Sequence, residues 1–276
     1  YANYKDKAVK IMRKALQTIV IGGLALCSLS ACTHCETTPS DVRVKTDSIT
    51  INNEVGNFSI KADCPILKTA ALTRTINEWL SETMGGTYEG GYNETLPIAK
   101  HYIKSVVSKD STDYAELKKD TTNNNREWKY EYICNVQKTA ETAKFVTCEY
   151  SCYEYQGGAH GSTFVTGQTF RKSDGRRIGW EVFNNSYDED LQNIIKAGLR
   201  KYFNVKNDDE LKSYLMLDNI YIIPLPKCSP LFTADGVKFV YGQYEIAPYA
   251  AGTPQFTIPY SQLNKFLNVT AKSLAE

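Results

Sequence analysis

Residues 127–156 read EWKYEYICNVQKTAETAKFVTCEYSCYEYQ, and this stretch decides the fold class. Aromatic and β-branched side chains fill 127–137 and 144–156, and a few polar residues between the two runs form a short turn. Such runs are typical of paired strands. Two further runs of the same kind follow, at 162–171 and 176–182. We therefore predict an antiparallel β-meander with tyrosines along one face.

Segments with helical periodicity lie on both sides of this meander. Apolar spacing predicts helices at 66–84, 96–119, 188–203, 208–217 and 261–271. Alternating or apolar runs predict further strands at 42–53, 58–62, 219–225, 237–244 and 256–258. Grouped strands and grouped helices favour an α+β fold over a doubly wound sheet. The expected architecture is an antiparallel β-meander sheet packed with helices, in two intimately associated subdomains.

The N-terminal segment indicates export. Leu29-Ser30-Ala31-Cys32 places small side chains before a cysteine, after a basic group at 12–14 and an apolar run at 15–29. That run is too short for a transmembrane helix. The pattern is typical of a bacterial lipoprotein, in which Cys32 receives a diacylglycerol. The alternative is an ordinary secretory signal whose cysteine is accidental.

This interpretation divides the chain into four expected parts. They are a signal peptide in 1–31, a lipidated tether in 32–41, and two halves of one folded module in 42–155 and 156–276. Translation is expected to start at Met12, which would leave 1–11 untranslated. The expected location is the cell envelope, on the periplasmic face of a membrane, with lipid on Cys32 as the membrane contact.

Composition argues against several classes of function. The whole sequence has a formal net charge of +1, whereas the part after residue 31 keeps 27 basic and 30 acidic residues, a net charge of −3. No basic run is long enough for a nucleic-acid surface, and a mildly acidic surface favours basic partners. His101 and His160 lack the spacing of a zinc site. We expect no metal, no cofactor and no nucleic-acid partner.

The cysteines of an exported protein are able to oxidise. Cys134 and Cys148 flank a turn that we place near Glu141, so they would face each other across a hairpin and form a disulfide. The alternative is that both are small buried thiols.

Two loops stand out as binding candidates. The first contains Gly157, Gly158 and His160; its glycines permit positive φ, and His160 is a possible base or ligand. The alternative is a glycine-rich connection in which His160 bonds to backbone. The second loop carries Tyr244, Glu245, Pro248 and Tyr249. Tyrosines on a proline-stiffened loop make good contact surface, although such a loop is also typical of a core crossover.

These two loops, in this order, resemble a known family: the extracytoplasmic module at the C-terminus of the anti-sigma factor RsiV, also found with the peptidoglycan deacetylase PdaC. The residues that carry the resemblance are Gly157–His160, Gly175, Val182-Phe183, Phe232, Asp235–Val237, Tyr244–Tyr249, Gly252 and Ile258–Tyr260. The resemblance implies an α+β module that is not catalytic in itself, here as a stand-alone lipoprotein. In RsiV the module binds lysozyme.

Three functions follow as hypotheses. The favoured one is a lipid-anchored, non-catalytic binding module that recognises a cell-envelope component such as peptidoglycan, or a lysozyme-like protein. The second is a cell-wall hydrolase with a site around His160 and Glu154 or Glu245 as the acid; no catalytic residue is assigned. The third is a structural or assembly lipoprotein that uses its tyrosine-rich sheet as an interface.

Overall fold

The computed structural model describes residues 42–66, 70–119 and 129–275. The expected signal peptide, the Met12 start and the lipidated Cys32 lie outside these residues. Within them, no helix combines the length and the apolar character that a membrane crossing needs.

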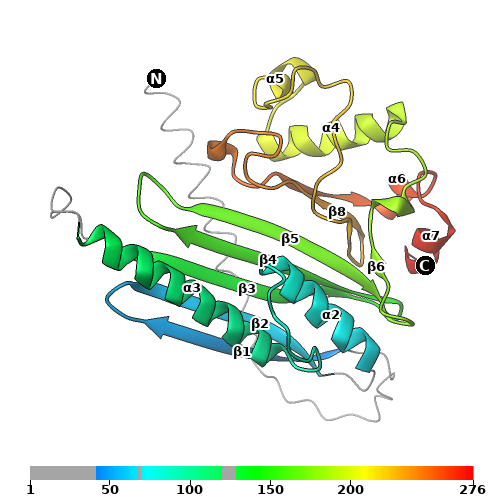
Figure 1. Cartoon of the computed structure of the whole chain (residues 1–276). Coiled ribbons are helices and arrows are strands. Elements are labelled where there is room, and N and C mark those ends of the chain that lie inside the picture. The colour runs from blue at the N-terminus through cyan, green and yellow to red at the C-terminus, as the bar shows by residue number, and fades with distance from the viewer. Residues whose placement is uncertain (1–41, 67–69, 120–128, 276) are drawn as a thin grey trace, which may run out of the picture.

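A six-stranded sheet forms the centre of the molecule, with its strands in the order β1-β2-β3-β4-β5-β6 (Figure 1). The strands are β1 Arg43–Asn52, β2 Gly56–Ile66, β3 Tyr130–Glu141, β4 Phe145–Tyr155, β5 Ser162–Arg171 and β6 Arg177–Ile178. The antiparallel meander predicted from 127 onward is confirmed as β3 to β6. The sheet as a whole is mixed, because β2 and β3 pair in parallel.

β2 and β3 pair in parallel because two helices connect them. These are α2 Ala70–Thr83 and α3 Thr95–Leu117, and they cover one face of the sheet (Figure 1). A crossover of this kind returns the chain in the same direction as the strand it left. Leu80 of α2 and Ile98 of α3 are buried with Phe58 of β2 in the core between helices and sheet.

The elements that follow β6, called the C-terminal half from here on, pack on the other face of the sheet, over β4 and β5 (Figure 1). Its elements are η2 Trp180–Val182, α4 Glu189–Phe203, α5 Asp208–Lys212, β7 Leu231–Phe232, β8 Gly236–Val240, η3 Tyr249–Ala251, β9 Gln255–Pro259, α6 Tyr260–Leu263 and α7 Val269–Ala275. The Asp188 side chain caps α4, and Leu191, Ile195 and Leu199 are fully buried along one stripe of it. This half therefore has a second core of its own.

Buried hydroxyl groups join the two halves. Thr147 and Thr169 face each other on β4 and β5, and both are fully buried. The Thr147 hydroxyl donates to the Phe232 carbonyl at 2.7 Å, and the Phe232 N–H donates to the Thr169 hydroxyl at 2.9 Å. Since a buried polar group without a partner costs about 1–3 kcal/mol, these contacts fix β7 against the meander.

The strand predicted at 219–225 is wrong. The chain is irregular there, because side chains supply the partners that a neighbouring strand would offer. The Gln192 side chain accepts from the Ile223 N–H at 2.7 Å and donates to its carbonyl at 3.2 Å. The Tyr241 hydroxyl donates to the Pro224 carbonyl at 3.0 Å.

The single closing helix predicted at 261–271 is also wrong. The chain instead forms α6 and α7, with a short bridge between Phe183 and Leu267 in the gap. The Asn268 side chain accepts from the Ala271 N–H at 3.0 Å and starts the second helix.

The predicted Cys134–Cys148 disulfide is wrong, and the structure pairs Cys134 with Cys152. The cause is the position of the turn, which lies between Glu141 and Phe145 rather than at Glu141. Cys134 therefore faces Cys152 across the hairpin, and Cys148 faces Lys138. Cys148 is a buried free thiol, and burial raises its pKa to about 12, so it stays protonated.

Candidate functional site

The loop between β4 and β5 needs its glycines. Gly157 and Gly158 adopt φ of 90° and 94°, a region that residues with a Cβ rarely occupy. At Gly161 an added Cβ would lie 2.5 Å from the Tyr153 hydroxyl and 2.6 Å from the Glu154 carbonyl. The Tyr155 hydroxyl donates to the Gly158 carbonyl at 3.1 Å. The loop is thus folded back on its own strand, and His160 is exposed at its end.

The loop after β8 is held by a carboxylate. Glu245 accepts from the Gly242 N–H at 2.6 Å and from the Lys227 N–H at 2.7 Å. This turn places Tyr244 at φ 63°, a left-handed conformation that is unusual for a bulky residue. The Tyr244 side chain is 54% exposed. Glu245 therefore shapes the loop, and Tyr244 is presented to solvent at a cost in backbone energy of roughly 1–2 kcal/mol.

The two loops meet. The His160 and Tyr249 rings stack with centroids 3.9 Å apart and planes inclined by 25°. The Tyr249 hydroxyl donates to the Gly161 carbonyl at 2.8 Å. The Tyr244 ring follows, with its centroid 5.8 Å from that of Tyr249. We call this row of three rings, His160, Tyr249 and Tyr244, the aromatic row.

Pro248 and Gln243 support the aromatic row. Pro248 is half-buried and precedes the short helix η3, which starts at Tyr249. The Gln243 side chain accepts from the Thr163 N–H at 3.0 Å and so joins the second loop to β5. The sequence prediction missed Gln243 and Tyr155. Neither has a distinctive signal, because their roles depend on which strand lies beside them.

The carboxylates expected beside His160 are placed differently. The described contacts of the His160 ring are the stack with Tyr249 and a 3.1 Å contact between Nδ1 and the Gly161 carbonyl. Glu245 binds two backbone N–H groups, and Glu154 lines a cavity beside β5. Among the residues that the structure describes, no group of three or more His, Cys, Asp or Glu side chains is arranged to hold a metal.

The tyrosines of the meander mostly face inward. Tyr130, Tyr132 and Tyr150 are at most 5% exposed and pack under α2 and α3. They contribute to the core, so the interface that the assembly hypothesis places on them is already covered by this chain's own helices.

Comparison with known proteins agrees with this architecture. Residues 51–163 match the family model described as "Deacetylase PdaC", and residues 181–261 match "Protein of unknown function (DUF3298)". A DUF3298 family member from Bacteroides fragilis NCTC 9343 has a similar crystal structure, with TM-score 0.65, 21% identity, and coverage of 82% of this chain and 94% of that one. A DUF3298 family protein from Pseudomonas aeruginosa PAO1 gives TM-score 0.55, 12% identity, and coverage of 84% and 97%.

At these identities the structural likeness concerns the fold. A comparison with functionally curated proteins gave no match. The family models and the shared fold together fit a PdaC/RsiV-like domain.

Proposed function

We propose that this PdaC/RsiV-like domain is a lipid-anchored, extracytoplasmic binding module that recognises a lysozyme-like protein through the aromatic row and is not itself a catalyst. The observation that carries the proposal is the joining of the two loops. His160 and Tyr249 stack across them, and Tyr244 remains exposed beside the stack.

The physical argument rests on preorganisation. A tyrosine whose loop is already fixed loses little conformational entropy when it binds, so more of its contact energy contributes to affinity. Glu245 fixes the loop from one side, and Gln243 and Tyr249 fix it from the other. A bulky residue held in a left-handed conformation also motivates a functional hypothesis, because its strain is retained in the folded state.

Charge and resemblance support the choice of ligand. The chain after residue 31 has a net charge of −3, which favours a basic partner through long-range attraction. The family that the two loops and their neighbouring motifs resemble includes a lysozyme receptor.

We expect Tyr244→Ser to weaken binding to immobilised lysozyme by about 2 kcal/mol, or about 30-fold. The reason is that the substitution removes the exposed ring and leaves the loop contacts of Glu245 in place. Surface plasmon resonance on the purified folded part measures the change. Tyr187→Ser is the matched control, since Tyr187 is 71% exposed and lies just before α4.

Equal affinities of the Tyr244 and Tyr187 variants for lysozyme would show that the aromatic row is not part of the interface. If the protein bound peptidoglycan fragments but not lysozyme, its ligand would be the envelope polymer instead of a protein. If the protein hydrolysed peptidoglycan or lysozyme and the His160→Ala variant lost that activity, the non-catalytic part of the proposal would be contradicted.

The lipid anchor has a separate test. We expect wild-type protein to sediment with membranes and Cys32→Ala to appear in the soluble extracytoplasmic fraction. Each buried lipid CH₂ contributes roughly 0.8 kcal/mol of membrane affinity, and the variant loses all of it. Fractionation with immunoblotting measures the distribution. A membrane-bound Cys32→Ala protein would show that another segment holds it there.

A further inference from the structure

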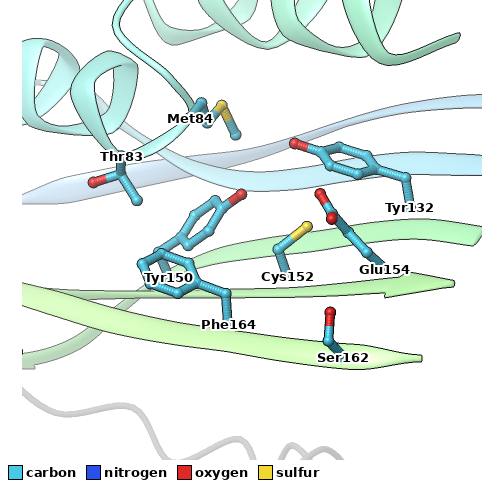
Figure 2. Close-up of a pocket in the computed structure, with 8 residues that line it drawn as sticks. All are labelled: Thr83, Met84, Tyr132, Tyr150, Cys152, Glu154, Ser162 and Phe164. Atoms are coloured by element: carbon cyan, nitrogen blue, oxygen red, sulfur yellow. The ribbon is translucent and has the colours of Figure 1, made fainter. Parts of the chain in front are cut away.

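A cavity of about 270 Å³ lies on the helix-facing side of the six-stranded sheet. Eight residues line it, and Figure 2 shows their side chains gathered between the end of α2 and strands β3, β4 and β5: Thr83, Met84, Tyr132, Tyr150, Cys152, Glu154, Ser162 and Phe164. It is distinct from the aromatic row. Thr163 contacts the second loop, whereas its neighbours Ser162 and Phe164 line the cavity.

The inner wall of the cavity is aromatic and polar. Tyr132 and Tyr150 are 5% and 3% exposed, and each hydroxyl acts on the pKa of the other. Burial raises the pKa of both, so both hydroxyls stay protonated and neutral and offer oxygen lone pairs. The Tyr150 hydroxyl also lies 3.2 Å from Sγ of Cys134, and the Cys134–Cys152 disulfide holds the two strands together beneath it.

The rim of the cavity is anionic on one side and apolar on the other. Glu154 is exposed, and Phe164 is 54% exposed. Across 42–66, 70–119 and 129–275, no lysine, arginine or histidine forms a salt bridge with Glu154. Glu149 on the same strand, by contrast, pairs with Lys238 at 2.7 Å.

The negative charge of Glu154 extends over its surroundings. It contributes, after burial, to the raised pKa of Tyr132 and Tyr150, and it acts in the same direction on Asp110. Asp110 is 2% exposed, and burial is the main cause of its raised pKa. This part of the molecule therefore favours a positive charge from outside.

We propose that this cavity binds the ammonium group of a small organic amine. The Glu154 carboxylate supplies the counter-charge, the Tyr132 and Tyr150 oxygens accept N–H hydrogen bonds, and the Phe164 ring covers the alkyl or sugar carbons next to the nitrogen. Aromatic faces attract cations in this way. The volume is close to the lower end of ligand pockets, so the site takes one amino sugar or one lysine-type side chain.

The probes are two pairs in which acetylation replaces the ammonium group by a neutral amide: glucosamine with N-acetylglucosamine, and lysine amide with its Nε-acetyl derivative. Both are titrated into the folded part under conditions that keep the free amines protonated, and binding is followed by ¹H–¹⁵N chemical shifts. We expect at least one amine to bind about tenfold or more tightly than its acetylated partner. The pair that shows the difference identifies the carrier of the ammonium group.

Glu154→Gln is expected to remove this preference, and Phe164→Leu to weaken amine binding several-fold. Glu131→Gln is the matched control. Glu131 lies on β3 next to the cavity-lining Tyr132 and pairs with Tyr155 of β4, so its side chain points to the other face of the sheet. Thermal unfolding of each variant verifies that the fold is retained.

Three outcomes would overturn the proposal. They are equal binding of amine and acetylated partner, unchanged amine binding in Glu154→Gln, and no binding of any probe up to high millimolar concentration. Equal binding would instead assign the cavity to neutral sugars or amides. Because the aromatic row lies elsewhere, none of these outcomes changes the expected affinity for lysozyme.

Discussion

Replacing Phe145 by alanine is expected to lower the free energy of unfolding by about 3–5 kcal/mol while the protein still unfolds in one transition. Phe145 is fully buried at the start of β4 and belongs to the core of the C-terminal half. Its ring meets that of Phe232 edge-on, with centroids 5.9 Å apart. Its neighbour Val146 is also fully buried, in the core under the helices. β4 therefore joins both cores, and a cavity at Phe145 weakens both halves together.

Denaturant unfolding followed by tryptophan fluorescence and by circular dichroism measures the effect. Phe164→Ala is the matched control, since Phe164 lies on the next strand and is 54% exposed; we expect it to cost less than about 1 kcal/mol. Two separate transitions in the Phe145 variant, with the N-terminal half unfolding as in the wild type, would show that the halves are energetically independent.

The strands and helices that bury a regular apolar face could be predicted from the sequence. The spacing of Leu191, Ile195 and Leu199 places α4, and the aromatic runs place β3 to β5, because the periodicity of burial matches that of the element. The irregular segment at 219–225 could not be predicted in this way. Its backbone partners are the side chains of Gln192 and Tyr241, which lie far from it in the sequence.

The candidate site shows the same division. Glycine at positions 157 and 158 permits positive φ, and both residues adopt it in the structure. The stack of His160 on Tyr249 depends on the packing of the C-terminal half over β5, which no local pattern contains. The cavity was missed for a related reason. Tyr132, Tyr150 and Glu154 read as alternating strand residues, and only the strand register places them together under the end of α2.

A hairpin fixes its cross-strand partners by the position of its turn. A turn placed two residues too early thus gave Cys148 as the partner of Cys134. The observed Cys134–Cys152 pair leads to the second large effect. Replacing both cysteines by alanine is expected to lower the free energy of unfolding by about 2–4 kcal/mol under oxidising conditions. The reason is that the bridge closes a loop with a sequence separation of 18, and the unfolded chain loses that constraint.

The decisive measurement is the response to reductant. The wild type and Cys148→Ala should both lose stability when dithiothreitol is added, because both keep the Cys134–Cys152 bridge. The stability of the Cys134→Ala/Cys152→Ala variant should not change when dithiothreitol is added. Cys148→Ala serves as the matched control, since Cys148 lies on the same strand and the same face, buried and unpaired. If Cys148→Ala also abolished the response to dithiothreitol, Cys148 would have to be part of the bridge, and the register of the hairpin would differ from the one described.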